Sequence, residues 1–404
     1  MTPFPIEDRA LRIVDFSTHM SGPLASHLLA EMGAEVIKVE PPVVGDGNRG
    51  DKLRINGEGL FHVALNSGVR SIAVSTRSEA WPSIVDACSR WADAVIVGSR
   101  PESARKRGLD FASLQRSNVD LVYCLISGFG TDGPWARYSA HGQTIDALAG
   151  LAPVEWRDGV PVTPAGWRST GGTLAGVFGA MGVLSGVLRR DRTGTAQHVT
   201  VSLWGSAMWW SWRDLTSLAN LGEPWGDYAE LGPRYAMYAT ADRRSILVAP
   251  IELKFWLEFC DLLGLPESWR DRGDWSSGSE FGVGPAHSEE ATVIAGVIKT
   301  KTLNEWWELF GATNIPFAPL LTVAEALESD HAAAQRVMRA TTTGGTAARV
   351  PAIPVRVGGS NSPDAGDVPA LPPLKGPPKL GEHTAEILAV LGLPKDLELQ
   401  EPNL

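Results

Sequence analysis

A glycine-rich stretch is the first candidate for chemistry in this sequence. Gly128 to Gly133 matches the G-x-G-x-x-G pattern and follows an apolar run that predicts a strand. A dinucleotide-binding turn also needs a helix that begins at the third glycine, so that the helix N-terminus faces the pyrophosphate. Pro134 and Trp135 come next instead. The pattern therefore argues against a nicotinamide or flavin cofactor.

His141 is a candidate for acid–base chemistry, because a neutral imidazole can take up or release a proton near pH 7. It immediately precedes a predicted helix over residues 144–151. The alternative role is that of a loop histidine that caps the helix or fills space. The nearest carboxylates are Asp146, Glu155 and Asp158, and we expect each of them to be a surface residue.

A basic cluster is the candidate for binding phosphate groups. Arg100, Arg105, Lys106 and Arg107 lie within eight positions, and their alternative role is a solvated helix face. The formal net charge of −10 excludes broad nucleic-acid binding, which needs a basic surface.

The three cysteines point to a reducing compartment. Cys88, Cys124 and Cys260 are far apart and have no metal-binding spacing, so we expect buried thiols and no metal site. No basic stretch followed by an apolar run is seen at the start of the chain, and we predict a cytoplasmic protein. The uncharged run from Gly171 to Leu188 is rich in Gly and Ala, which favours a buried helix over a membrane span.

The elements that position these residues alternate between strands and helices. Arg12 to Glu40 predicts strand, helix and strand, with a ligand-accepting loop over residues 17–22 at the carboxyl end of the first strand. Five apolar runs predict strands: Arg12–Phe16, Ala34–Val39, Ser71–Val74, Ala94–Val97 and Leu121–Ile126. This alternation is typical of an α/β fold with a doubly wound, Rossmann-like parallel sheet.

The remaining chain predicts two long helices, at Thr173–Arg190 and Val199–Leu221, and then a second αβ pattern. The length of 404 residues predicts two domains or one large discontinuous domain. Thr341–Thr346 is interpreted as a linker. Four tryptophans lie close together, which favours core or interface packing, with a pocket for an aromatic acyl group as the alternative: Trp204, Trp209, Trp210 and Trp212.

The chain resembles the family III CoA-transferases, whose members include formyl-CoA and carnitine CoA-transferases, with α-methylacyl-CoA racemase as a relative. The matching stretches are spread over the sequence: Arg12–Glu40, Ala64–Ser71, Ala92–Val97, Ser127–Pro134, Tyr238–Asp242, Lys254–Trp256, Ala318–Thr322 and Leu380–Thr384. The resemblance implies a discontinuous large domain over 1–222 and 346–404, with a smaller inserted α+β domain over 223–345. It also implies an interlocked dimer, acyl-CoA and carboxylic acid substrates, and no covalently bound cofactor. It also implies an aspartate that attacks the thioester and carries the acyl group as a mixed anhydride.

That aspartate is missing from the sequence, because the matching position is Gly172. The stretch from Val160 to Leu188 contains no Asp or Glu, so a small shift of the alignment does not restore a carboxylate. A glycine cannot act as a nucleophile. We therefore expect the chain alone to be inactive in CoA transfer.

The resemblance assigns CoA binding to the loop residues His19, Met20 and Ser21, together with Arg70 and Lys106. Other positions depart from the family pattern, since Pro41, Val69 and the pair Gly98-Ser99 replace residues that often contact CoA. Loss of several phosphate contacts, each worth on the order of 1 kcal/mol, would weaken binding without abolishing it.

Three functions follow as hypotheses. The first is a non-catalytic subunit of a CoA-transferase that moves CoA between an acyl-CoA, such as succinyl-CoA, and a carboxylic acid, with a paralogous chain or a second copy as partner. The second is an acyl-CoA racemase, isomerase or lyase that uses His141, which matches the histidine of the racemase. The third is a non-catalytic acyl-CoA-binding protein. No nucleic acid or membrane partner is expected.

Overall fold

The computed structural model describes residues 5–6, 9–225, 231–283, 287–357 and 371–399. The chain forms two compact units, one of Met1–Trp212 with Ala334–Leu404 and the other of Arg213–Ala333. The unit boundaries thus fall earlier in the chain than the predicted boundaries at 222 and 345. Each unit is described separately below.

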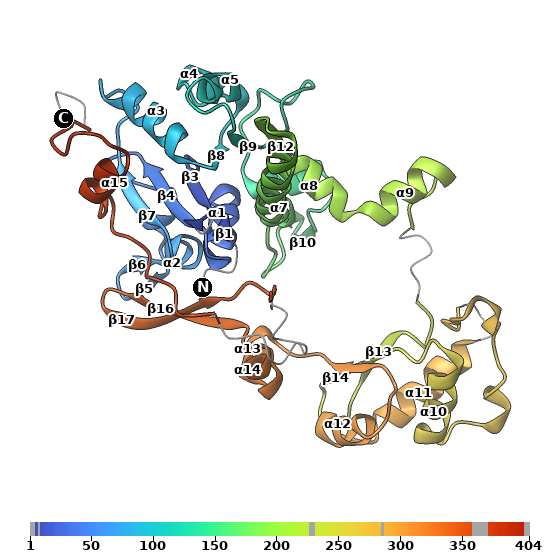
Figure 1. Ribbon diagram of the computed structural model, residues 1–404. Coiled ribbons are helices and arrows are strands. Elements are labelled where there is room, and N and C mark those ends of the chain that lie inside the picture. The colour runs from blue at the N-terminus through green and yellow to red at the C-terminus, as the bar shows by residue number, and fades with distance from the viewer. Residues whose placement is uncertain (1–4, 7–8, 226–230, 284–286, 358–370, 400–404) are drawn as a thin grey trace. The chain divides into compact units, whose positions relative to one another are not determined.

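The large unit is built on a six-stranded parallel sheet with the strand order β12-β9-β8-β3-β4-β7 (Figure 1). Its strands are β3 (Arg12–Asp15), β4 (Glu35–Glu40), β7 (Arg70–Ala73), β8 (Ala94–Gly98), β9 (Val122–Ser127) and β12 (Gln197–Ser202). The five predicted strands are all present, within one residue at either end. The predicted parallel α/β sheet is confirmed.

The sixth strand, β12, corrects the predicted helix over Val199–Leu221. β12 pairs in parallel with β9 along its whole length, from Gln197 beside Val122 to Ser202 beside Ser127. Its central Val-Thr-Val residues are β-branched, which favours a strand in this pairing. The helical part begins after it and is divided in two, α8 (Leu203–Trp210) and α9 (Trp212–Leu221).

Helices cover both faces of this sheet, as the alternation of the strand side chains requires. On one face, Val14 and Ile37 pack with α3 (Trp81–Trp91), α5 (Phe111–Gln115) and α15 (Thr384–Val390). On the other, Ile13 and Val36 pack with α1 (Ser21–Glu31) and α7 (Thr170–Thr193). The shorter helices of this unit are α2 (Leu60–Asn66), α4 (Pro101–Lys106) and α6 (Gly142–Leu148).

The helix α7 is the buried helix that the sequence predicted over Gly171–Leu188. By length and composition alone it could cross a membrane, but half of its most apolar window is buried within the protein. Its glycines allow close packing with neighbouring elements. A Cβ added at Gly176 would lie 2.7 Å from Leu24 of α1, and a Cβ added at Gly179 would lie 2.7 Å from Ile126 of β9. We interpret α7 as a core helix.

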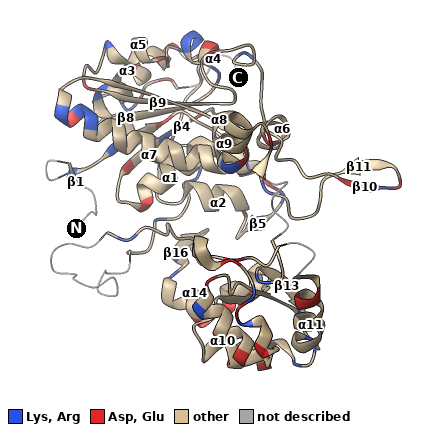
Figure 2. Cartoon of the chain, turned by 90° about the vertical axis from the view of Figure 1, so that its right-hand side faces the viewer, with Lys and Arg blue, Asp and Glu red and all other residues tan. Residues whose placement is uncertain are grey.

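Four two-stranded hairpins complete the large unit. They are β1 (Pro5–Ile6) with β2 (Arg9–Ala10), β5 (Arg54–Ile55) with β6 (Glu58–Gly59), β10 (Glu155–Arg157) with β11 (Val160–Val162), and β16 (Met338–Thr343) with β17 (Thr346–Pro351). The β16–β17 hairpin overturns the predicted linker at Thr341–Thr346, because Gly344 and Gly345, both with positive φ, form a tight turn. Figure 2 shows the β10–β11 hairpin projecting from the large unit.

The small unit has a three-stranded antiparallel sheet, β13 (Ala236–Ala239), β14 (Ser245–Val248) and β15 (Phe317–Pro319), in that order. Its helices are α10 (Leu253–Leu263), α11 (Ser288–Ile298), α12 (Leu303–Gly311) and α13 (Val323–Glu328). The helices α9 and α14 (Asp330–Gln335) each cross the boundary between the two units, and α9 belongs to the small unit from Arg213 onward. The core is aromatic, with Trp256, Trp269 and Trp306 at most 2% exposed. Arg234 lies over the ring of Trp256 and pairs with Glu290 inside this core.

Candidate active site

Three helix N-termini meet beside the carboxyl end of β3. The loop after β3 leads into α1, and the Ser21 hydroxyl donates a 2.8 Å hydrogen bond to the carbonyl of Gly172 in the first turn of α7. Gly142 at the start of α6 lies against Ser169, the N-cap of α7, where a Cβ would come within 2.4 Å of the Ser169 hydroxyl. In a parallel α/β sheet, this edge is the usual place for a ligand.

Met20 fills the space beside Gly172. A Cβ on Gly172 would lie 2.1 Å from the Met20 methyl carbon and 3.2 Å from the Ser169 hydroxyl. Any side chain at position 172 therefore requires Met20 to move. The structure thus brings together Gly172, Met20 and Ser21, which the sequence comparison placed in one site.

Asp146 corrects the predicted surface carboxylate, because it is fully buried. Its two oxygens accept 2.8 Å hydrogen bonds from the backbone N–H groups of Thr170 and Gly171, at the start of α7. A carboxylate here satisfies unpaired amides and complements the helix dipole. Sequence reasoning missed this cap because it comes from another helix, α6. The other two candidate carboxylates, Glu155 and Asp158, are exposed on the β10–β11 hairpin, as expected.

His141 is the N-cap residue of α6 and is exposed. Its backbone is held by Thr144, whose hydroxyl accepts from the His141 N–H at 3.1 Å and donates to the His141 carbonyl at 2.8 Å. The ring of His141 faces that of His19, with 6.5 Å between the ring centroids and an angle of 84° between the planes. No motif in the sequence relates these two histidines.

The backbone of His19 is fixed in a left-handed conformation, with φ of +69°. Its N–H donates to Asp46 at 2.9 Å, and its carbonyl accepts a short hydrogen bond from the Asn48 side chain. The imidazole lies against Gly47 of a 3₁₀ turn, η1 (Gly47–Gly50), where a Cβ would come within 2.5 Å of the ring. These contacts determine both the backbone and the ring position of His19.

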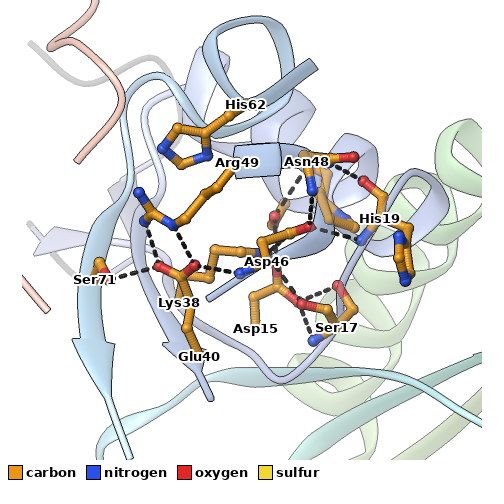
Figure 3. A network of polar contacts seen from close by, with 12 residues as sticks. Asp15, Ser17, His19, Lys38, Glu40, Asp46, Asn48, Arg49, His62 and Ser71 are labelled. Carbon is orange, nitrogen blue, oxygen red and sulfur yellow. Dashed lines mark hydrogen bonds and ion pairs between the residues drawn. The ribbon is translucent and has the colours of Figure 1, made fainter. Parts of the chain in front are cut away.

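A buried ion cluster supports this loop (Figure 3). The Lys38 ammonium lies 2.9 Å from Asp46 and 3.4 Å from Asp15, and it donates to the Ser17 carbonyl at 3.0 Å. Burial by itself lowers the pKa of Lys38, but the charges of Asp15 and Asp46 outweigh it, and the net shift is upward. Lys38 therefore stays charged and ties the loop after β3 to the segment that holds η1.

Glu40 joins the same cluster to the far end of the chain. It accepts from Arg49 at 2.7 and 2.8 Å and from Ser71 at 2.6 Å. Burial opposes ionisation, but the hydrogen bonds and charge of Arg49 lower the pKa of Glu40 to about 2. Arg49 also donates to the carbonyl of Pro378 at 2.9 Å, and the N–H of Gly381 donates to Ser71 at 3.0 Å.

The two basic residues predicted to bind CoA lie in different places. Arg70 is the first residue of β7, at the amino-terminal edge of the sheet, and pairs with Glu35 and Glu386. It is not beside the loop after β3, and we leave it out of the candidate site. The resemblance matched the residue type but did not show which edge of the sheet it occupies. Lys106 ends α4 and pairs with Glu102 at 2.8 Å on the surface.

Two neighbouring cavities share Trp81 and Arg107, and one of them lies beside the loop after β3. One, of about 610 Å³, is lined by Thr18 and by residues that follow β4 and β7, including Pro41 and Arg77. The other, of about 600 Å³, includes Lys106, and Trp81 and Arg107 line both. Arg77 was not predicted as a site residue from the sequence. Its position just after the predicted strand Ser71–Val74 nevertheless places it at the ligand-binding edge of the sheet. Among the described residues, no group of three or more His, Cys, Asp or Glu side chains is arranged to hold a metal ion.

Comparison with known proteins gives matches over nearly the whole chain. The sequence model of CoA-transferase family III matches residues 9–384. The acetyl-CoA:oxalate CoA-transferase of Acetobacter aceti is 25% identical over 390 residues, covering 95% of this chain and 96% of that protein. The succinate–glutarate CoA-transferase of Agrobacterium fabrum is 27% identical, covering 94% of each chain.

Solved structures show the same fold. The crystal structure of Rv3272 from Mycobacterium tuberculosis aligns with a TM-score of 0.75 at 24% identity, over 93% of this chain and 97% of that one. A CAIB/BAIF family protein from Brucella suis aligns with a TM-score of 0.72 at 24% identity, over 94% of this chain and 98% of that one.

Proposed function

Because this chain belongs to CoA-transferase family III, we propose that it is the non-catalytic subunit of a CoA-transferase whose nucleophilic carboxylate comes from a related partner chain. Members of the family exchange CoA between an acyl-CoA and a carboxylic acid, and both are substrates rather than resident cofactors. The proposal gives this chain the role of completing and stabilising the complex. The acyl donor would be a thioester such as succinyl-CoA.

The observation that carries this proposal is the pair Gly172 and Met20. The resemblance puts the family nucleophile at position 172, where this chain has no side chain and where Met20 fills the adjacent space. An Asp at this position could not be accommodated beside Met20 in its present place. The nearest buried carboxylate, Asp146, is fully used as the cap of α7 and faces two backbone amides. Asp146 is therefore not available as a substitute nucleophile for acyl transfer.

Two cavities support the part of the proposal that concerns CoA binding. Thr18 and Arg77 line one cavity, Lys106 lines the other, and Arg107 lines both. These side chains combine cations for phosphate groups with the apolar ring of Trp81, which suits a nucleotide with an acyl-pantetheine arm. Under this proposal the acyl end would extend along His19, Met20 and Ser21 towards Gly172.

A partner chain is suggested by an exposed apolar surface on α7 and α8, here called the α7–α8 face. It contains Met181 and Leu188 of α7 and Trp209 and Trp210 of α8, all between 54% and 62% exposed. Exposed tryptophans and aliphatic side chains are typical of protein–protein interfaces. We place the partner chain there, either a paralogous subunit or a second copy in an interlocked dimer. The three buried free thiols fit a cytoplasmic complex.

Co-expression with a paralogous chain that carries the family aspartate tests this proposal. We expect a stable complex of both chains by native mass spectrometry, and CoA transfer from succinyl-CoA that disappears when the partner's aspartate is replaced by alanine. The chain purified alone should bind acyl-CoA but transfer CoA no faster than a protein-free control. Transfer by the lone chain at ordinary enzyme rates, of order 1–10³ per second, contradicts the proposal.

A further inference from the structure

A further cavity, of about 610 Å³, lies in the large unit at the open end of the β16–β17 hairpin, opposite its turn. It is separate from the candidate active site. Glu31 and Met32, at the end of α1, line the cavity, whereas the candidate site lies at the start of this helix. The 11 residues of α1 put roughly 16 Å between the two places.

The walls of this cavity are largely apolar. Met32, Ile353 and Leu371 line it, together with three valines that are 40–52% exposed: Val337, Val355 and Val357. Sites for small molecules typically measure about 300–1,000 Å³ and combine apolar walls with a few polar groups. The cavity therefore suits a ligand with an apolar body.

The charged side chains of the cavity are mainly cations. Arg336, Arg339 and Arg356 line it with a single carboxylate, Glu31, so three positive charges and one negative charge leave a balance of +2. The chain as a whole has a formal net charge of −10. A local excess of positive charge attracts an anion, and this excess is enclosed by apolar walls.

Glu31 leaves part of the Arg339 guanidinium available to a ligand. Both residues are buried, and the Glu31 oxygens accept from Arg339 Nη1 at 3.1 Å and from the N–H of Ile353 at 2.6 Å. Arg339 Nη1 also donates to the Glu31 carbonyl at 3.2 Å, and Nε donates to the Pro372 carbonyl at 2.7 Å. Arg339 Nη2 donates to none of the described residues. Its two N–H groups therefore remain for an acceptor in the cavity.

Arg356 is fixed beside the segment that carries Arg336. Its Nη2 donates at 2.7 Å to the carbonyl of Gln335, the residue before Arg336. Like charges that line one cavity repel each other, and a bound anion removes this repulsion. The planar guanidinium groups match the two oxygens of a carboxylate.

We propose that this cavity is a binding site for an amphipathic carboxylate. The carboxylate is held by Arg336, Arg339 and Arg356, and the hydrocarbon chain lies against Val337 and Val355. This inference rests neither on CoA binding nor on a partner chain.

The test uses the full-length chain alone and sodium decanoate, with excess CoA present so that the candidate active site is occupied. Calorimetry should show saturable binding of one decanoate per chain. 1-Decanol and decylammonium have the same hydrocarbon chain without the carboxylate and should bind at least about tenfold more weakly, because they leave the arginines without an acceptor. Absence of saturable decanoate binding, or equal affinity for 1-decanol, overturns the inference.

Single arginine substitutions test the charged end of the site. Arg336→Gln and Arg356→Gln should each weaken decanoate binding by about tenfold, as expected for loss of one charged hydrogen-bonding group. Arg349→Gln is the matched control, since Arg349 is exposed on β17 and is not among the residues that line the cavity. Equal decanoate affinities in all three variants would contradict the role of the arginines.

Filling the cavity tests the apolar end without changing the charge. Val355→Trp should abolish decanoate binding, whereas Val119→Trp, at a residue that is 70% exposed before β9, should bind like the unmodified chain. Decanoate should raise the melting temperature of the unmodified chain and of Val119→Trp, but not that of Val355→Trp. Normal decanoate binding by Val355→Trp would overturn the assignment to this cavity.

Discussion

At the scale of single residues, Met20 and Gly172 decide what the site can do. The terminal methyl of Met20 occupies the place where the first atom of a side chain at 172 would lie, 2.1 Å from the ideal Cβ position. The thioether chain is flexible and can swing aside, but it then moves into the space where the acyl group is expected. A carboxylate side chain introduced at position 172 would therefore compete with Met20 for this space.

This competition predicts the outcome of a two-step rescue. Gly172→Asp alone should give little CoA transfer in the lone chain. The double variant Met20→Ala with Gly172→Asp should be faster by at least about tenfold, which corresponds to roughly 1.4 kcal/mol of barrier. The measurement is transfer from succinyl-CoA to oxalate and glutarate, with Met20→Ala alone as the inactive control. Equal rates in the single and double aspartate variants would show that Met20 does not block the position.

Glu40 predicts how the loop responds to acid. Its pKa falls from 4.5 to about 2 in the folded chain, chiefly through Arg49 against the effect of burial. A carboxyl group whose pKa is lowered by folding stabilises the folded chain above pH 4.5. This stabilisation is lost as the pH falls towards 2. The difference between the pKa of Glu40 in the unfolded and in the folded chain corresponds to roughly 3 kcal/mol in the free energy of unfolding. Urea unfolding should therefore show a steeper loss of stability between pH 4.5 and 2 in the unmodified chain than in Glu40→Gln, which is already destabilised at pH 7. Parallel curves for the two proteins would contradict this.

At the scale of elements, the N-terminus of α7 depends on a cap from α6. Asp146 accepts from Thr170 and Gly171, and Ser169 accepts from Gly172, so three first-turn amides are satisfied. This arrangement fixes the start of α7 next to the loop that carries Met20 and Ser21. It also leaves these three amides unable to bind a ligand, which distinguishes α7 from the uncapped α1.

Removing the charge of this cap should destabilise the large unit. Asp146→Asn keeps the size but loses the charge and one acceptor, and we expect a loss of about 1–2 kcal/mol in the free energy of unfolding by urea. Asp158→Asn is the matched control. Asp158 is exposed on the β10–β11 hairpin and has a φ of +51°, which Asn tolerates equally well. The substitution Asp158→Asn should therefore leave the free energy of unfolding almost unchanged. Similar losses in both variants would rule out a specific cap.

The elements also show what the sequence could and could not predict. Apolar runs gave five sheet strands, because a strand buried on both faces leaves an unambiguous pattern. β12 was mistaken for the start of a helix, because it runs directly into α8 and its pairing with β9 is not visible in the sequence. Asp146 and the His19–His141 pair were missed because residues far apart in sequence meet there. Arg70 was predicted to bind CoA from the resemblance alone, although its place directly before the predicted strand Ser71–Val74 put it at the amino-terminal edge of the sheet.

At the scale of the whole molecule, the α7–α8 face predicts how the complex assembles. Trp210→Glu places an unpaired carboxylate in the proposed interface, and burial of such a charge costs several kcal/mol. The variant should fold but fail to form the complex with its partner at micromolar concentration, as measured by light scattering after size-exclusion chromatography. Val119→Glu, at a residue that is 70% exposed before β9, should leave assembly unchanged. A Trp210→Glu complex of normal mass would place the interface elsewhere.

The buried cluster around Lys38 and Glu40 also has a consequence for biosynthesis. The sheet, α1 and η1 leave the ribosome early, but Arg49 and Ser71 complete their hydrogen bonds only with Pro378 and Gly381. Segments near the N-terminus generally fold first during translation. The loop that orients His19 thus acquires its final support after almost the entire polypeptide has been made. A ribosome that stalls within the last part of the message would release a chain with an assembled sheet and an unfinished active-site loop.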